Sequence, residues 1–143
     1  MTVIAWDGKT LAADKQATLN RTTYTTTKIS KHGQALVAIV GTYVDGAAML
    51  NWFLSGMDPE KFPKLYNEDD ACLWVFTSDS IVRFEDSPYP ITVEDTIVSD
   101  GSGGGIALGA MLMGADAVTA VKLAMERDIY SGGGIDVLQL GNV

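Results

Sequence analysis

The chain has 143 residues, of which 47% are hydrophobic and 20% are charged, and its formal net charge at pH 7 is -8. This size and composition predict one domain, residues 1–143, with enough apolar side chains for a core. The negative charge argues against binding to nucleic acid or anionic membranes, and the sequence shows neither a membrane-spanning run nor a signal peptide.

The chain contains one cysteine, Cys72, and one histidine, His32. One cysteine allows no internal disulfide and no thiolate metal site, which predicts the cytoplasm as compartment and no metal or other cofactor. A Ser-His-Asp or Cys-His mechanism would have to use His32. Because His32 lies in Lys31-His32-Gly33, a predicted turn, we interpret it as a solvated turn residue and expect any hydrolytic base to be another group.

The first part of the chain predicts antiparallel strands. Asp7-Gly8 is expected to join strands at residues 2–6 and 10–13, because Asp-Gly between apolar runs is typical of a β-hairpin. Residues 22–30 are rich in threonine, a strand former, and are expected to pair as one strand with the apolar residues 34–40.

Residues 44–55 are predicted to form a helix, because their apolar side chains leave few polar gaps. Asp45 is expected to cap the start of this helix, and Gly56 to end it. Residues 58–70 are polar and contain two prolines, which predicts a loop or a broken helix.

The second half of the chain predicts a mixture of strands and helices. In chain order we expect a hairpin of two strands, a further strand, two helical segments and a last strand, at residues 71–76, 80–84, 91–98, 106–113, 115–127 and 135–140. Hairpins favour antiparallel sheets, and stacked sheets with helices outside would bury both kinds of element. The sequence therefore predicts an α+β sandwich.

Thr2 is a candidate nucleophile. Methionine aminopeptidases remove Met1 when the second residue is small, which would leave a free α-amine beside the Thr2 hydroxyl. An α-amine has a pKa of about 8, so it can take the hydroxyl proton without a histidine. The alternative is that Thr2 is an ordinary residue of the first strand without a catalytic role.

Asp14 and Lys28 are the charged residues expected beside Thr2. A hairpin at Asp7-Gly8 places residue 14 opposite residue 2, and opposite residues of an antiparallel pair share a face. A carboxylate at the end of an apolar strand needs a partner, and Lys28 in the next predicted strand is the candidate. Such a buried pair would lower the proton affinity of the hydroxyl, and a surface salt bridge is the alternative.

Five segments, in chain order, resemble motifs of proteasome β subunits and of the bacterial HslV peptidase. The segment Leu11-Ala12-Ala13-Asp14-Lys15-Gln16-Ala17-Thr18 resembles the second-strand signature, and Lys28-Ile29 resembles the active-site lysine. Gly41-Thr42-Tyr43-Val44-Asp45-Gly46 resembles the oxyanion-hole glycine with the start of the first helix. Gly101-Ser102-Gly103-Gly104 resembles the loop beside the nucleophile, and Asp128-Ile129-Tyr130-Ser131-Gly132-Gly133 resembles the element that supports the threonine amine.

The resemblance implies a four-layer αββα sandwich of N-terminal-nucleophile hydrolase type, in a small variant whose second helix is reduced because residues 58–70 are short and contain prolines. It implies Thr2 as nucleophile and, through its amine, as base. Asp14 and Lys28 would form a charged pair beside the hydroxyl, and the Gly41 N–H would stabilise the oxyanion. The groups that orient the amine and its proton-relaying water would be Ser102, Asp128 and Ser131. Ile39 and Tyr43 are candidates to line the side-chain pocket.

The predicted function is a threonine-type peptidase that cuts peptides or unfolded proteins through an acyl-enzyme on Thr2. The resemblance implies a homo-oligomeric ring fed by an ATP-driven unfoldase. Two alternatives stay open: a structural or assembly protein that kept the fold without activity, and an N-terminal-nucleophile amidase acting on a small molecule. Nucleotide binding at residues 101–105 is disfavoured, because Ile106 stands where the phosphate-binding pattern needs glycine and no Walker lysine is present.

Overall fold

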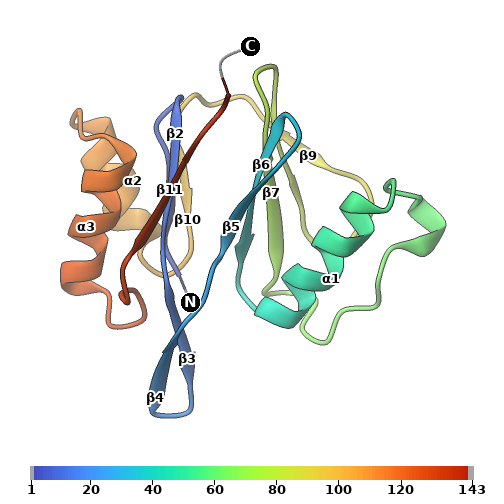
Figure 1. Cartoon of the computed structure of the whole chain (residues 1–143), viewed down its shortest axis with the longest axis horizontal. Coiled ribbons are helices and arrows are strands. Elements are labelled where there is room, and N and C mark those ends of the chain that lie inside the picture. Colours follow the sequence, from blue (N-terminus) through green and yellow to red (C-terminus); the bar gives the residue numbers. More distant parts are fainter. Residues whose placement is uncertain (1, 142–143) are drawn as a thin grey trace.

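The computed structural model describes residues 2–141, in which two antiparallel sheets form the body of the molecule (Figure 1). One sheet has the order β10-β1-β2-β11, with strands at Ile4–Trp6 (β1), Thr10–Asp14 (β2), Val98–Asp100 (β10) and Ile135–Gln139 (β11). The other has the order β5-β6-β7-β8-β9, with strands at Ile29–His32 (β5), Ala35–Val40 (β6), Cys72–Phe76 (β7), Ile81–Phe84 (β8) and Ile91–Val93 (β9). These elements confirm the α+β class and the antiparallel sheets.

Helices cover the outer faces of both sheets, as Figure 1 shows. They are α1 (Tyr43–Leu54) on the second sheet, and α2 (Gly104–Leu112) and α3 (Ala117–Arg127) on the first. No helix within residues 2–141 has the length and apolar character to cross a membrane.

The core consists of three buried clusters, one between the sheets and one beneath each group of helices. Between the sheets lie Ile4, Leu11, Leu36 and Phe76, all fully buried. Helix α1 packs on the second sheet through Met49 and Trp52 against Ile39 and Leu73. Helices α2 and α3 pack on the first sheet mostly through small side chains, which allow close approach: Val3, Ala5, Ala12, Ala107, Ala120, Val121 and Ala124. These clusters bury both faces of each sheet, and Thr2 lies just before β1.

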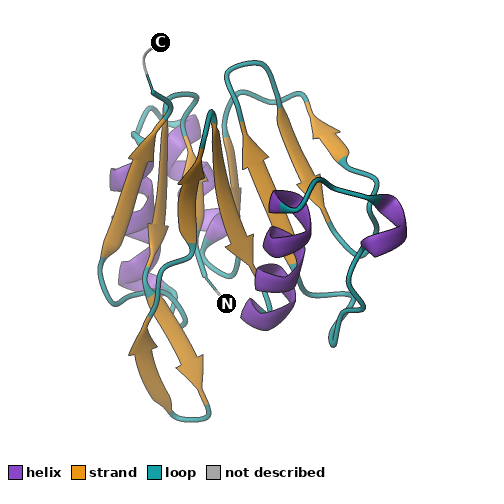
Figure 2. Cartoon of the chain, turned by 45° about the vertical axis from the view of Figure 1, so that its right-hand side comes forward, coloured by secondary structure: helices purple, strands orange, loops and turns teal. Residues whose placement is uncertain are grey.

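The single strand predicted over residues 22–30 is wrong. Its first part is β4 (Thr22–Thr25), which pairs with β3 (Gln16–Leu19) in a separate hairpin, and its last part is β5. The turn is at Asn20, whose φ of 57° is tolerated best by asparagine among residues with side chains. The hairpin projects beyond the body of the molecule (Figure 2), so its polar residues need no core-facing pattern.

The strand predicted over residues 91–98 is also divided. Its first part, β9, pairs with β8, whereas its last residue begins β10, which pairs with β1 in the other sheet. Glu94 and Asp95 lie in the connection, where the chain leaves one sheet for the other. His32 is not in the turn either: it ends β5, and its Nε2 lies 2.7 Å from Ser30 Oγ.

Asp45 does not cap helix α1 as predicted, since Thr42 is the N-cap residue. The Asp45 side chain is buried and accepts hydrogen bonds from the backbone N–H groups of Tyr66 and Asn67, each at 2.8 Å. Residues 58–70 contain one short 3-10 helix, Pro59–Lys61 (η1), which agrees with the predicted loop or broken helix. A buried carboxylate with these donors thus ties the connection to α1.

Candidate active site

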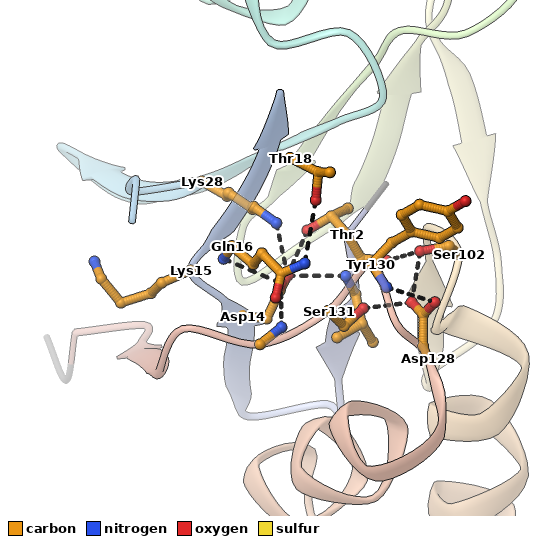
Figure 3. A network of polar contacts seen from close by, with 12 residues as sticks. Thr2, Asp14, Lys15, Gln16, Thr18, Lys28, Ser102, Asp128, Tyr130 and Ser131 are labelled. Atoms are coloured by element: carbon orange, nitrogen blue, oxygen red, sulfur yellow. Dashed lines mark hydrogen bonds and ion pairs between the residues drawn. The ribbon is translucent and has the colours of Figure 1, made fainter. Parts of the chain in front are cut away.

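Thr2, Asp14 and Lys28 meet at one buried oxygen atom (Figure 3). Thr2 Oγ1 donates a hydrogen bond to Asp14 Oδ1 at 2.7 Å, and Lys28 Nζ donates to the same atom at 2.8 Å. The exposed fractions are 2% for Thr2, 0% for Asp14 and 6% for Lys28. The hydroxyl, the carboxylate and the ammonium therefore form one buried unit.

Backbone donors complete the coordination of the Asp14 carboxylate. Val3 N–H donates to Oδ1 at 3.0 Å, and the N–H groups of Gln16 and Gly132 donate to Oδ2 at 3.2 and 3.0 Å. These bonds compensate for the desolvation of a buried charge. Burial lowers the pKa of Lys28, while the hydrogen bond and the charge of Asp14 oppose that shift.

The contact between Thr2 and Asp14 arises from a register other than the predicted one. Ile4 pairs with Ala13, and Asp14 N–H donates to Val3 O at 3.2 Å, so Asp14 lies opposite Val3 rather than Thr2. The turn is longer than an Asp-Gly pair because the Asp7 carboxylate accepts the N–H groups of Lys9 and Thr10. The Asp14 side chain reaches the preceding residue, which places it beside the Thr2 hydroxyl.

Lys28 lies in the connection between β4 and β5, immediately before β5 rather than within a strand. Its carbonyl oxygen accepts the N–H of Ile39 at 2.9 Å, which extends the pairing of β5 with β6 by one residue. The backbone of Asp14 is held in one sheet and that of Lys28 is held against the other, so their ion pair joins the two sheets.

A second polar cluster, built on Asp128, lies beside the backbone of Thr2 (Figure 3). Asp128 Oδ2 accepts hydrogen bonds from Ser102 Oγ at 2.6 Å and from Ser131 Oγ, and Oδ1 accepts the N–H of Tyr130 at 3.1 Å. Partial burial raises the pKa of Asp128, but these hydrogen bonds outweigh it and lower the pKa overall. Ser102 Oγ is also 3.3 Å from Thr2 O, so Ser102 connects this anionic cluster to the candidate nucleophile.

The glycine-rich segment before α2 packs directly on Thr2. Gly103 N–H donates to Thr2 O at 3.1 Å, and Gly101 has a φ of 93°. A Cβ atom at residue 101 would lie 2.2 Å from Thr2 O. Because only glycine fits both the conformation and the space, this segment positions Thr2 by backbone contact.

A pocket of about 340 Å³ opens beside Thr2 and Lys28, within the size range of ligand-binding pockets. Gly41 lines it with Ile39 and Tyr43, the two residues predicted to do so. Gly41 has a φ of 85°, and a Cβ atom there would lie 2.1 Å from Asp70 O. The other lining residues are Gln16, Ala17, Thr18, Leu19, Thr26, Thr42, Val44 and Asp70.

Several contributors to the site were not predicted from the sequence. The N–H groups of Gln16 and Gly132 bind Asp14, and the side chain of Gln16 donates to Ile129 O at 3.0 Å. Asp70 reaches the pocket from the connection that follows α1. Within residues 2–141, no group of three or more His, Cys, Asp or Glu side chains is arranged to hold a metal ion.

Comparison with known proteins finds similarity in structure but not in sequence. No family model matches the chain, and no curated protein matches it. Similar solved structures include BPH, a β-proteasome homologue of Thiobacillus denitrificans, in complex with epoxomicin, with a TM-score of 0.72 and 19% identity over 99% of this chain and 100% of that chain. A further structure of BPH has a TM-score of 0.71 and 20% identity over 99% of each chain.

The eukaryotic HslV of Trypanosoma brucei is also similar, with a TM-score of 0.67 and 20% identity over 96% of this chain and 97% of that chain. The match extends over nearly the whole length of each protein, so it concerns the complete arrangement of sheets and helices rather than one motif.

Proposed function

Because the chain has the N-terminal-nucleophile hydrolase fold of proteasome β-like proteins, we propose that it is a threonine-type peptidase whose nucleophile is Thr2 after removal of Met1. The observation that supports this most directly is the contact of Thr2 Oγ1 with the buried Asp14–Lys28 pair. A hydroxyl in that position is near a cation that favours its deprotonated form.

In the proposed reaction, the α-amine of Thr2 takes the hydroxyl proton, directly or through a water molecule. Oγ1 then attacks the carbonyl carbon of the scissile bond, and the Gly41 N–H stabilises the oxyanion, an interaction worth about 3 kcal/mol in comparable sites. The peptide C–N bond breaks, the leaving amine takes the proton, and an ester on Thr2 remains. Water hydrolyses this ester, and the free hydroxyl is restored.

The two polar clusters have different roles in this proposal. Asp14 holds the Lys28 ammonium, which lowers the proton affinity of Oγ1. Asp128, Ser102 and Ser131 orient the new α-amine and its water, because Ser102 already contacts the Thr2 backbone. No histidine takes part, in agreement with a chain whose His32 binds Ser30 elsewhere.

We further propose that residues 1–143 form a four-layer αββα sandwich of this hydrolase type, in a small variant with a reduced second helix. The support is the arrangement of helices on both sheets and the short η1 in place of a long helix. We place the protein in the cytoplasm, since its one cysteine, Cys72, is buried and free.

We propose that the peptidase works in a homo-oligomeric ring that receives peptides or unfolded proteins from an ATP-driven unfoldase. Helix α2 supports self-association, because Gly104–Leu112 contains no charged residue although it lies at the surface. At its end, Leu112 is 69% exposed and Met113 is 89% exposed. Exposed apolar side chains of this kind often mark protein–protein contacts.

Labelling with epoxomicin, the ligand of the BPH structure, tests the proposed mechanism. A peptide epoxyketone reacts with the hydroxyl and the amine of one N-terminal threonine together. We expect intact mass to show loss of Met1 and one added inhibitor, and peptide mapping to place the inhibitor on Thr2. Thr2→Ala is the control and should carry no label.

Each outcome of this experiment separates the alternatives. A folded, processed chain that stays unlabelled contradicts the threonine mechanism and favours the structural or assembly role. A labelled chain that cuts none of a panel of fluorogenic peptides favours the small-molecule amidase. Cleavage that persists in Thr2→Ala would assign the nucleophile to another residue.

A further inference from the structure

The pocket beside Thr2 has two charged residues in its lining, Lys28 and Asp70. Lys28 is already bound to Asp14 at 2.8 Å. Asp70 Oδ2 accepts a hydrogen bond from Thr42 Oγ1 at 2.7 Å, and no ion pair among residues 2–141 includes Asp70. One oxygen of the carboxylate therefore has a hydrogen-bond partner, and the group has unused capacity for a cationic partner.

Asp70 lies close to the point where the substrate carbonyl would be bound. Its backbone oxygen packs against Gly41, where a Cβ atom would come within 2.1 Å of it. In the proposed reaction the Gly41 N–H binds the oxyanion of the scissile bond. The substrate residue whose carbonyl forms the acyl-enzyme would therefore lie beside Gly41. Its side chain would extend into the pocket that Asp70 lines.

The pocket wall combines threonine and glutamine side chains with an apolar part, and the apolar part suits a long side chain with an apolar stem. Ala17, Leu19, Ile39, Tyr43 and Val44 supply apolar lining. Lysine and arginine bury their methylene groups against such surfaces while the charged end meets a carboxylate or water. Leucine would fill the walls but leave the carboxylate without a cation, and glutamate would be repelled by it.

We propose that this pocket takes the lysine or arginine side chain of a peptide residue immediately before the scissile bond, and that Asp70 is the specificity-determining residue. The inference rests on the proposed function for the cleavage step, whereas the binding preference itself is independent of Thr2 chemistry. Since Asp70 is exposed at the rim, we expect a preference of about 5- to 10-fold over leucine rather than an absolute one.

The test uses binding, so that it does not depend on catalysis. In the full-length Thr2→Ala chain, NMR titrations compare peptides that differ only in one residue, arginine, leucine or glutamate. We expect the arginine peptide to bind about 5- to 10-fold more tightly than the leucine peptide, with the glutamate peptide weakest. In Asp70→Asn, which still accepts from Thr42, this preference should fall to about twofold or less.

Asp69→Asn is the matched control, because it removes one negative charge from the adjacent residue, which does not line this pocket. It should leave the preference unchanged. In the processed wild-type chain, kcat/KM for fluorogenic peptides should follow the same order as the binding affinities.

Three results would overturn the assignment: equal binding of arginine and leucine peptides, an equal loss of preference in Asp70→Asn and Asp69→Asn, or no binding of any peptide. Failure of the proposed function has a different signature. If epoxomicin does not label Thr2 but Asp70-dependent arginine binding persists, the pocket assignment stands and the peptidase assignment falls.

Discussion

Two acidic residues flank Thr2, and their surroundings differ. Asp14 is fully buried, and its carboxylate is surrounded by an ammonium, a hydroxyl and three backbone N–H groups. Asp128 is only partly buried, and its neighbours are two serine hydroxyls and one N–H group. Asp14 is neutralised by a buried cation, whereas Asp128 is stabilised chiefly by hydrogen bonds.

The difference suits the proposed mechanism, in which one threonine acts as both nucleophile and base. A buried ion pair is fixed in place, because any movement would leave a charge without partners in a low-dielectric environment. A half-exposed serine–aspartate cluster can exchange its partners with water at little cost. The first environment suits a hydroxyl that must keep one position, and the second suits an amine that gains and loses protons.

The largest expected effect is loss of the buried pair. Asp14→Ala leaves the Lys28 ammonium buried without its partner and three N–H groups without their acceptor. We expect the free energy of unfolding to fall by about 3–5 kcal/mol, measured by urea denaturation. Asp136→Ala is the control, because it breaks an ion pair with Lys15 whose side chains are 23% and 32% exposed.

The control should cost about 1 kcal/mol or less, as for other exposed ion pairs. Equal losses of unfolding free energy in the two variants would mean that the buried Asp14–Lys28 pair stabilises the protein no more than the more exposed Lys15–Asp136 pair. That result would remove the basis for treating the two clusters around Thr2 as different.

The glycine segment that carries Ser102 provides a second way to test the exposed cluster. Gly101→Ala places a Cβ atom 2.2 Å from Thr2 O at a φ of 93°, so the backbone must shift. We expect a loss of about 2–4 kcal/mol in unfolding free energy and slower labelling of Thr2 by epoxomicin.

Gly105→Ala is the matched control in the same glycine-rich stretch, residues 101–105. No atom lies within 4 Å of the added Cβ, and residue 105 is inside helix α2. Alanine there should be neutral or stabilise the protein by about 0.5–1 kcal/mol. If Gly101→Ala behaves in the same way, the segment does not position Thr2.

Much of the site could be predicted because its key residues are unusual for their place in the sequence. Asp14 ends an apolar strand, and a carboxylate there requires a cation, which led to Lys28. Gly41 was predicted from the family resemblance, and its positive φ, like that of Gly101, is a conformation that glycine adopts more readily than other residues. Physical chemistry alone therefore predicted the contact of Asp14 with Lys28, whereas the roles of the glycine and serine segments were predicted only from the family resemblance.

The parts that could not be predicted depend on backbone geometry or on long connections. The Gly132 N–H donates a hydrogen bond to Asp14, which is 118 residues away in the sequence. Every residue except proline has such a backbone donor, so the residue type does not reveal which one binds Asp14. The β3–β4 hairpin is built from polar, threonine-rich residues without a buried face, so alternation did not reveal where it turned. Asp70 lies beside Gly41 at the end of a long connection that Asp45 binds at Tyr66 and Asn67, an arrangement that the sequence does not reveal.

The smallest expected effect concerns the exposed cluster itself. Asp128→Asn keeps one acceptor oxygen, so we expect a loss of only about 1 kcal/mol in unfolding free energy at pH 7. The pKa of Asp128 is lowered in the folded protein, so its contribution is present above the ordinary value of 3.8 and is lost as pH falls below it. The difference between wild type and variant should therefore shrink in acid, as measured by urea denaturation at a series of pH values.

Asp116 distinguishes this site effect from a general carboxylate effect. It caps α3, and hydrogen bonds from Thr119 lower its pKa as well, but among residues 2–141 no side-chain hydrogen bond or ion pair joins it to Thr2, Ser102 or Ser131. Asp116→Asn should therefore leave epoxomicin labelling unchanged, whereas Asp128→Asn should slow it. If both variants label at the wild-type rate, Asp128 contributes to stability alone. The serine hydroxyls must then orient the amine without the negative charge of Asp128.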